Sequence, residues 1–119
     1  MNGMFVFATS FNQDISSWIV SNVTNMYGMF EEALAFNQDI SSWDVSNVTA
    51  MQRMFFSATS FNQDISNWIL NPVCNIFEMF SYCTALLSGS FAQIISTTWN
   101  GPPNSISAAQ LMAAGLPHP

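Results

Sequence analysis

Phe11-Asn-Gln-Asp-Ile-Ser16 returns as Phe36-Asn-Gln-Asp-Ile-Ser41 and again as Phe61-Asn-Gln-Asp-Ile-Ser66, so successive copies begin 25 residues apart. The same step separates three tryptophans and the first residues of four Met-Phe pairs: Trp18, Trp43 and Trp68, and Met4, Met29, Met54 and Met79. A fixed period of this length is typical of stacked repeat units, each of which buries its apolar face against its neighbours. The sequence therefore predicts a repeat architecture.

The second copy shows the pattern of a strand followed by a turn. Ile40, Trp43 and Val45 follow the apolar-x-x-apolar-x-apolar spacing of the strand in leucine-rich-type repeats. Because side chains alternate between the two faces of a strand, Trp43 and Val45 are predicted to point inward and Asp44 outward. The two residues that follow Val45 are predicted to turn the chain.

After this turn the spacing changes from that of a strand to that of a helix. Apolar residues follow at intervals of three, three, one, three and three positions, at Val48, Met51, Met54, Phe55, Ala58 and Phe61. Such intervals place side chains on one face of a helix, which we predict from about Thr49 to Ala58. The methionines are interpreted as core residues, because no His or Cys accompanies them as in a soft-metal site.

Together these elements predict an α/β fold of about four 25-residue units, each consisting of a strand, a turn and a short helix. We expect a leucine-rich-repeat-like solenoid with a parallel sheet on one face. The solenoid is assigned to residues 1–100, with a partial first unit and an irregular fourth unit. For residues 101–119, which begin with a Gly-Pro-Pro sequence, a cap helix from about Ala108 to Ala114 and a disordered tail are the two alternatives.

Composition restricts the classes of partner. The chain has 119 residues, which suits one domain, and half of them are hydrophobic, which is enough for a core. Arg53 is its only Lys or Arg, and the formal net charge is −6. Binding of nucleic acids or anionic membranes depends on clustered basic side chains, so neither is expected as a partner. No apolar run approaches the roughly 18 residues of a membrane span.

Two polar ladders recur in the copies of the opening motif. They are Asn12, Asn37 and Asn62, and Asp14, Asp39 and Asp64. The asparagines are predicted to bond the backbone of adjacent loops. Each aspartate either accepts a local N–H in an Asx turn or joins a stack of carboxylates that binds calcium. The turn is favoured, because calcium needs about six to eight oxygen ligands and each unit supplies few.

No catalytic set is recognisable in the sequence. The only histidine, His118, lies between two prolines at the end of the chain. Phosphate-binding loops, zinc-ligand spacings and nucleophile motifs are absent from the sequence. We therefore predict a protein that is not an enzyme and that needs no cofactor or metal.

The segment Phe36-Asn-Gln-Asp-Ile-Ser-Ser-Trp-Asp-Val-Ser-Asn-Val-Thr49, followed by Met51-x-x-Met54-Phe55-x-x-Ala58, resembles the repeat of BspA-like leucine-rich-repeat surface proteins. This unit is also known as the bacterial surface protein 26-residue repeat. The resemblance covers three consecutive copies and a decayed fourth. It implies a solenoid fold, a location at the cell surface or secretion, and a role in adhesion or protein binding. It marks no binding residue, because the matching positions are those of the scaffold.

The candidate binding surface is the outward face of the predicted sheet. It contains the row Ile19, Asp44 and Ile69, flanked by Ser17, Ser42 and Asn67. Grouped apolar residues on a surface mark protein contacts, whereas isolated exposed isoleucines are simply tolerated. We predict a protein-binding or adhesion module whose partner is an extracellular-matrix or host or cell-surface protein. The alternative is a structural segment or fragment of a longer solenoid without independent activity.

The start of the chain falls inside a repeat, because Met1 aligns with Met26 and Met51. This register favours a fragment of a longer protein or a reading frame begun at an internal Met. Residues 1–5 lack the basic and apolar regions of a secretory signal, so no signal peptide is predicted. An uncapped N-terminal edge is predicted to allow self-association with another chain.

Overall fold

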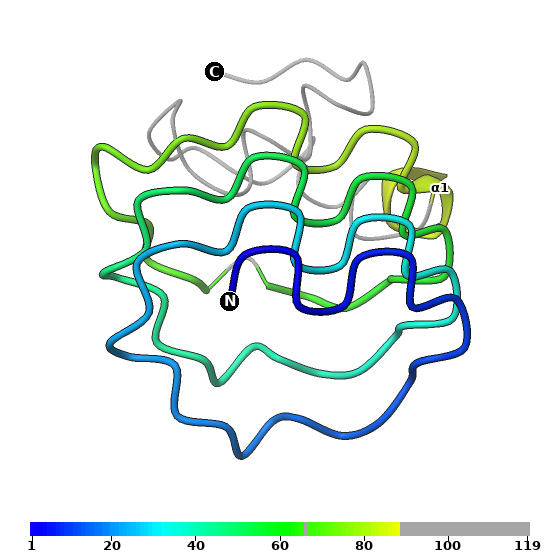
Figure 1. The fold of residues 1–119 in the computed structure, drawn as a ribbon, viewed down its shortest axis with the longest axis horizontal. Helices are drawn as coiled ribbons and strands as arrows, with labels where there is room; N and C mark the ends of the chain where they lie inside the picture. The colour runs from blue at the N-terminus through cyan, green and yellow to red at the C-terminus, as the bar shows by residue number, and fades with distance from the viewer. Residues whose placement is uncertain (66, 89–119) are drawn as a thin grey trace.

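The computed structural model describes residues 1–65 and 67–88, in which the chain winds into successive coils that lie side by side (Figure 1). We number the repeats 1–25, 26–50 and 51–75, with a fourth beginning at residue 76. Among the described residues the only helix is α1, Thr84–Ser88. Isolated parallel bridges join Asn25 to Ala50 and Ala50 to Asn75. The described part is therefore compact but has little regular secondary structure.

The predicted parallel sheet is not found in the described part of the chain, and residues 40–45 do not form a strand. Side chains, rather than backbone N–H groups, connect this segment to the first repeat. The indole Nε1 of Trp43 donates to the Ile15 carbonyl at 3.1 Å, and the Asn47 amide donates to the Ser21 carbonyl at 2.7 Å. The predicted orientations were correct, since Trp43 and Val45 are buried and Asp44 is exposed.

The helix predicted from Thr49 to Ala58 is wrong as well, because this segment consists of consecutive turns. Met54 N–H donates to the Met51 carbonyl at 3.2 Å, and Ala58 N–H donates to the Phe55 carbonyl at 2.9 Å. The third residue of each of these turns is left-handed, with φ of +56° at both Arg53 and Ser57. A right-handed helix requires negative φ throughout, so these two residues interrupt it.

This turn segment carries the backbone bonds between repeats. In the third repeat, Met51 N–H donates to the Asn75 carbonyl at 2.8 Å, and Phe55 N–H donates to the Met79 carbonyl at 3.0 Å. The second repeat is bonded to the third in the same way, with Gly28 N–H donating to the Gln52 carbonyl at 2.9 Å. Alternate residues thus pair in parallel, although the left-handed turns keep the pairing from becoming an extended strand.

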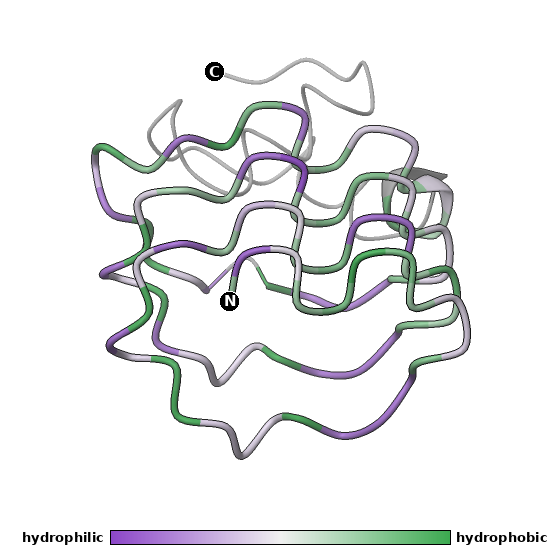
Figure 2. Cartoon of the chain, viewed as in Figure 1, coloured by the Kyte–Doolittle hydropathy of each residue, from purple (hydrophilic) through white to green (hydrophobic). Residues whose placement is uncertain are grey.

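The core between the two sides of each coil is a large aromatic cluster. Seven phenylalanines form two stacked columns, with centroids 5.5–5.7 Å apart in one and 5.8–5.9 Å apart in the other. The columns are Phe5, Phe30, Phe55 and Phe80, and Phe11, Phe36 and Phe61. Hydrophilic stretches lie one above another in the lower arcs of successive coils (Figure 2). The prediction that the methionines are core residues is confirmed for the second and third repeats, whose stacked phenylalanines are buried as well.

The asparagine ladder confirms its predicted structural role. The Oδ1 atom of Asn12 accepts from Asn37 N–H at 2.8 Å, and Asn37 Oδ1 accepts from Asn62 N–H at 2.9 Å. The glutamines of the same motif, to which the sequence analysis assigned no role, form a second ladder beside it. Gln38 Nε2 donates to both the carbonyl and the Oδ1 atom of Asn12, at 3.0 and 3.1 Å. These hydrogen bonds therefore fix the register of each repeat relative to the next.

The left-handed turns provide a test of this backbone geometry. Ser57→Gly is expected to raise the free energy of unfolding by about 0.5–1 kcal/mol, because glycine adopts positive φ without the steric cost of a Cβ atom. The glycine keeps the N–H that donates to the Ser81 carbonyl at 2.9 Å. Urea unfolding followed by tryptophan fluorescence measures the change. Ser17→Gly, at an exposed residue without positive φ, serves as control and should not stabilise; a loss of stability in Ser57→Gly would contradict the turn assignment.

Several sequence predictions concern residues outside the described part. They are the irregular fourth unit beyond Ser88, the cap helix or tail in residues 101–119, the position of His118, and the third motif copy's Ser66.

Candidate functional site

The outward row of Ile19, Asp44 and Ile69 is fully on the surface. Ile19 is 89% exposed and Ile69 is 78% exposed, the two highest values among the exposed large hydrophobic side chains of the described residues. Asp44 occupies the equivalent position of the repeat between them and is also exposed. One row across three neighbouring repeats thus presents an apolar, an acidic and an apolar side chain.

The flanking residues Ser17, Ser42 and Asn67 are exposed too. The Ser42 hydroxyl donates to the Ser16 carbonyl at 3.3 Å, which holds this part of the second repeat against the first. The Asn71 amide donates to the Ser46 carbonyl at 3.3 Å and holds the third against the second. Side-chain bonds therefore bring together the segments that carry the outward row.

Asp44 has a local structural role in addition to its place in the row. Its Oδ1 atom accepts the Ser46 hydroxyl at 2.6 Å and the Ser46 N–H at 3.1 Å. These bonds, the hydroxyl bond first, lower the pKa of Asp44 below its ordinary value. The carboxylate is therefore negatively charged at neutral pH, between two uncharged isoleucine positions.

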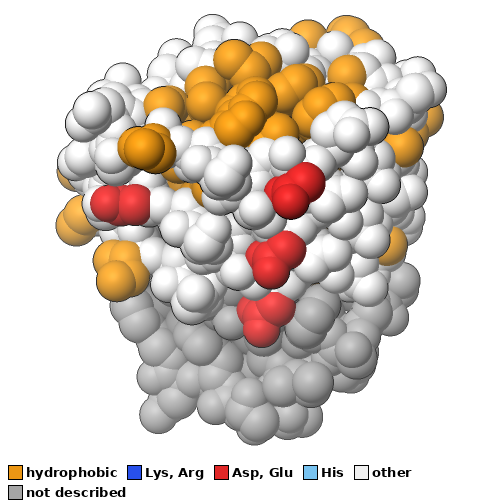
Figure 3. All heavy atoms as spheres, turned by 90° about the horizontal axis from the view of Figure 1, so that it is seen from below, with side chains coloured by type: hydrophobic (Ala, Val, Ile, Leu, Met, Phe, Trp, Pro, Cys, Tyr) orange, Lys and Arg blue, Asp and Glu red, His pale blue; other side chains and the backbone are white. Residues whose placement is uncertain are grey.

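Two members of the aspartate ladder, Asp14 and Asp39, belong to turns, as the favoured interpretation predicted. Asp14 Oδ1 accepts the Ser16 N–H at 2.9 Å, and Asp39 Oδ1 accepts the Ser41 N–H at 2.9 Å. Hydrogen bonds from the serine side chains and then from these N–H groups lower the pKa of both aspartates. Figure 3 shows a line of acidic side chains on one face and, apart from it, an acidic side chain near hydrophobic ones. In the part of the chain described, no group of three or more His, Cys, Asp or Glu residues is placed to hold a metal ion.

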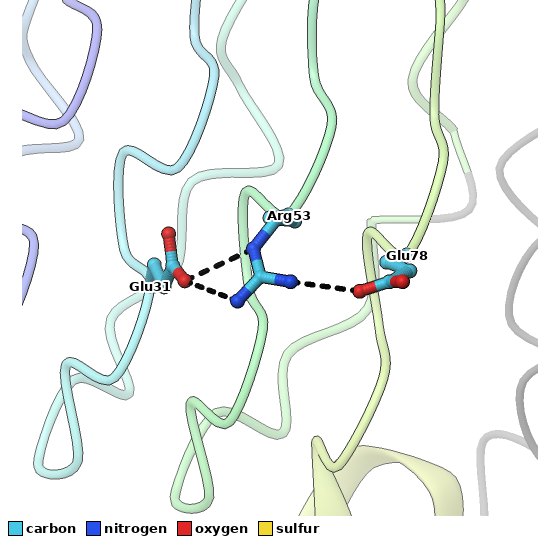
Figure 4. Close-up of polar contacts among 3 residues, drawn as sticks. All are labelled: Glu31, Arg53 and Glu78. Atoms are coloured by element: carbon cyan, nitrogen blue, oxygen red, sulfur yellow. Dashed lines mark hydrogen bonds and ion pairs between the residues drawn. The ribbon is translucent and has the colours of Figure 1, made fainter.

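An ion-pair network that the sequence analysis missed connects the second, third and fourth repeats (Figure 4). Arg53 donates to Glu31 Oε1 from Nε at 3.0 Å and from an Nη atom at 2.6 Å, and it donates to Glu78 Oε2 at 2.8 Å. The guanidinium also lies 3.7 Å from the centroid of the Phe56 ring. The hydrogen bond to Glu31 is the main cause that raises the pKa of Arg53. Because the guanidinium of Arg53 is occupied by Glu31, Glu78 and the Phe56 ring, we assign Arg53 a structural role.

The cysteines offer no reactive thiol to this surface. Cys74 and Cys83 are free, and burial raises the pKa of Cys74 to about 11 and that of Cys83 to about 12. A thiol with such a pKa is almost entirely protonated at neutral pH and is a poor nucleophile.

Within residues 1–65 and 67–88, no helix has the length and apolar character of a membrane span.

Comparison with known protein families assigns the chain to one family. Residues 1–99 match the family model described as Mycoplasma protein of unknown function, DUF285. The chain belongs to the DUF285 family. The match covers every repeat described above, including the outward row. No curated protein and no solved structure matches the chain at a significant level.

Proposed function

We propose that this DUF285 chain is a non-enzymatic protein-binding or adhesion module that binds its partner through the outward row. The observation that carries the proposal is the exposure of Ile19 and Ile69, at 89% and 78%. Burying such side chains against a partner would contribute about 1.5–3 kcal/mol each. The acidic Asp44 between them would supply orientation, because a charge at a contact restricts which partner surfaces fit.

The surroundings of the row support this role. Its neighbours Ser17, Ser42 and Asn67 are short, so the isoleucine side chains project beyond them. Exposed apolar side chains surrounded by polar ones are a usual arrangement at a protein contact. The partner that we propose is an extracellular-matrix, host or cell-surface protein, and the location is the cell surface or the exterior, both from the resemblance to BspA-like proteins.

We also propose that the coils form a solenoid related to leucine-rich repeats, although built from turns instead of strands and helices. Support comes from bonds that recur from repeat to repeat with the same atoms. Trp43 Nε1 donates to Ile15 O and Trp68 Nε1 donates to Ile40 O, both at 3.1 Å. Such translation of one contact along the chain is the defining property of a solenoid.

A second candidate role is that of a structural segment in a longer solenoid. The observation in its favour is that the residues repeated without change, such as Asn37 and Trp43, are occupied with inter-repeat bonds. Under this alternative, the two isoleucines are tolerated surface residues and contribute to no contact.

The test replaces both isoleucines by the residue that the second repeat has at this position. Ile19→Asp with Ile69→Asp is expected to leave the unfolding midpoint nearly unchanged, because Asp44 is accommodated there. Binding to immobilised extracellular-matrix proteins, such as collagen and laminin, should weaken at least about tenfold in biolayer interferometry.

The matched control is Leu34→Asp with Phe77→Asp, which makes the same charge change at two other exposed apolar positions. It should retain the binding of the unmodified chain. Equal binding by the control and by the isoleucine variant would favour the structural alternative over the binding module.

A further inference from the structure

A column of residues with left-handed backbone crosses the turn segments of the four repeats. We call it the left-handed column; it consists of Phe7, Glu32, Ser57 and Tyr82, which lie 25 positions apart. Their φ angles are 55°, 55°, 56° and 61°. Hydrogen bonds join adjacent repeats along the column, for example from Glu32 N–H to the Phe56 carbonyl at 2.7 Å. Because the same conformation recurs in bonded repeats, the four side chains leave the backbone on the same side.

The column places exposed aromatic rings on both sides of a carboxylate. Phe7 is 61% exposed and Tyr82 is 68% exposed, whereas Glu32 is partly exposed. The Glu32 carboxylate forms no ion pair with any described residue. Backbones paired in parallel lie about 4.8 Å apart, so Glu32 is about that far from Phe7 and roughly 10 Å from Tyr82. Along the column, only the short side chain of Ser57 lies between Glu32 and Tyr82.

Arg53, which lies beside this column, shows how such a surface holds a cation. Its guanidinium lies 3.7 Å from the centroid of the Phe56 ring and donates to Glu31 Oε1 at 2.6 Å. Figure 4 shows the guanidinium between Glu31 and Glu78. The Phe56 ring is in turn nearly perpendicular to the Tyr82 ring, with centroids 5.4 Å apart. A guanidinium held by a carboxylate and an aromatic ring therefore already exists next to the ring of Tyr82.

Charge and distance indicate which occupant fits the column. A guanidinium arranged like that of Arg53 spans about 7 Å from the ring to the carboxylate oxygen, which fits between Tyr82 and Glu32. The formal net charge of the chain is −6, and Arg53 is its only Lys or Arg. Because Arg53 is occupied by its own partners, no second Lys or Arg among the 119 residues is available to Glu32. The complementary group is therefore a cation that a partner supplies.

We propose that the left-handed column binds an arginine side chain in a basic peptide segment of a partner protein. The guanidinium stacks on the Tyr82 ring and donates to Glu32, as Arg53 does with Phe56 and Glu31. The negative face of the ring attracts the cation, and the carboxylate adds charge-assisted hydrogen bonds. The column contains no residue of the outward row, so the proposal does not depend on the proposed function.

Fluorescence anisotropy with a short labelled peptide of alternating arginine and glycine tests the proposal. The unmodified chain is expected to bind this peptide with a Kd between about 1 and about 100 µM. A peptide with citrulline in place of arginine has the same shape without the charge and should bind at least about tenfold more weakly. Equal binding of the two peptides overturns the proposal, because it indicates a neutral occupant. Absence of binding by the arginine peptide overturns it as well.

Variants of the chain locate the contact. Glu32→Gln and Tyr82→Leu each remove one part of the site and should each weaken binding of the arginine peptide at least about threefold. Tyr82→Phe retains the ring and should bind like the unmodified chain, and the unfolding midpoint of each variant reports on folding. Asp44→Asn makes the same charge change in the outward row and should leave the Kd unchanged. The proposal is overturned if both column variants bind normally, or if Asp44→Asn weakens binding as much as Glu32→Gln.

Discussion

Phe55→Ala is expected to lower the free energy of unfolding by about 3–5 kcal/mol, the largest effect that we predict for a single substitution. The Phe55 ring is completely buried, with ring centroids of Phe30 and Phe80 at 5.5 and 5.7 Å and that of Phe61 at 4.3 Å. The backbone cannot close the resulting cavity, because Phe55 N–H is bonded to the Met79 carbonyl at 3.0 Å. Urea unfolding followed by tryptophan fluorescence measures the loss.

Phe5→Ala is the matched control, because Phe5 has the same position in the first repeat. Phe5 stacks on Phe30 at 5.5 Å, but it is only partly buried. Its loss should therefore cost only about 1–2 kcal/mol, since the ring is only partly buried. If the two variants lost equal stability, stacking between successive repeats would not be the main contribution of this column.

The core was predictable because burial depends mainly on the period. Equivalent apolar residues 25 positions apart must share an environment in any stacked repeat, whatever the local backbone does. Met29, Met54 and Met79 illustrate this, since all three are buried. The first repeat departs from the rule at Met4 and Trp18, where the described residues supply no preceding repeat to cover the side chains.

The helix could not be excluded by spacing alone. Intervals of three residues fit a helical face, but they also fit consecutive turns that each close by a bond from residue four to residue one. Met54 N–H to Met51 O and Ala58 N–H to Phe55 O are bonds of this kind. The available signal was glycine at one position of the first two repeats, Gly3 and Gly28, both with φ of +61°. The third repeat has Arg53 at this position, so the glycine does not recur in all three repeats.

The strand pattern predicted the orientation of side chains but not the source of the hydrogen bonds. Alternation placed Trp43 inside and Asp44 outside, which the structure confirms. Inside this segment, however, indole and amide groups connect the repeats, and nothing in an apolar-polar pattern distinguishes them from backbone donors. The outward row could be placed because it depends only on orientation and period.

The Arg53 network could not be found from the period. Its partners Glu31 and Glu78 lie 22 and 25 residues away, so only one of the two pairs follows the repeat spacing. The other depends on how far a long side chain extends across the turn surface. The 25-residue spacing therefore could not predict this network, which occurs in one copy only.

Trp43→Phe is expected to lower the free energy of unfolding by about 1–3 kcal/mol, from the lost hydrogen bond and the smaller ring. Trp43 is buried, and its Nε1 donates to the Ile15 carbonyl at 3.1 Å. That carbonyl also accepts Trp18 N–H at 3.1 Å, so it retains one partner in the variant. The stability lost in Trp43→Phe should therefore be smaller than in a variant that leaves a buried carbonyl without any hydrogen bond. Thermal and urea unfolding give the change in stability.

The control at the equivalent position shows how much the buried and hydrogen-bonded indole of Trp43 contributes. Trp18→Phe makes the same chemical change in the first repeat, where the indole donates to no described residue and the ring is 38% exposed. It should cost less than about 0.5 kcal/mol, the range of surface substitutions. A cost at Trp43 no greater than that at Trp18 would show that the indole bond contributes nothing. The connection between repeats on this side would then depend on the amides of Asn47 and Asn71.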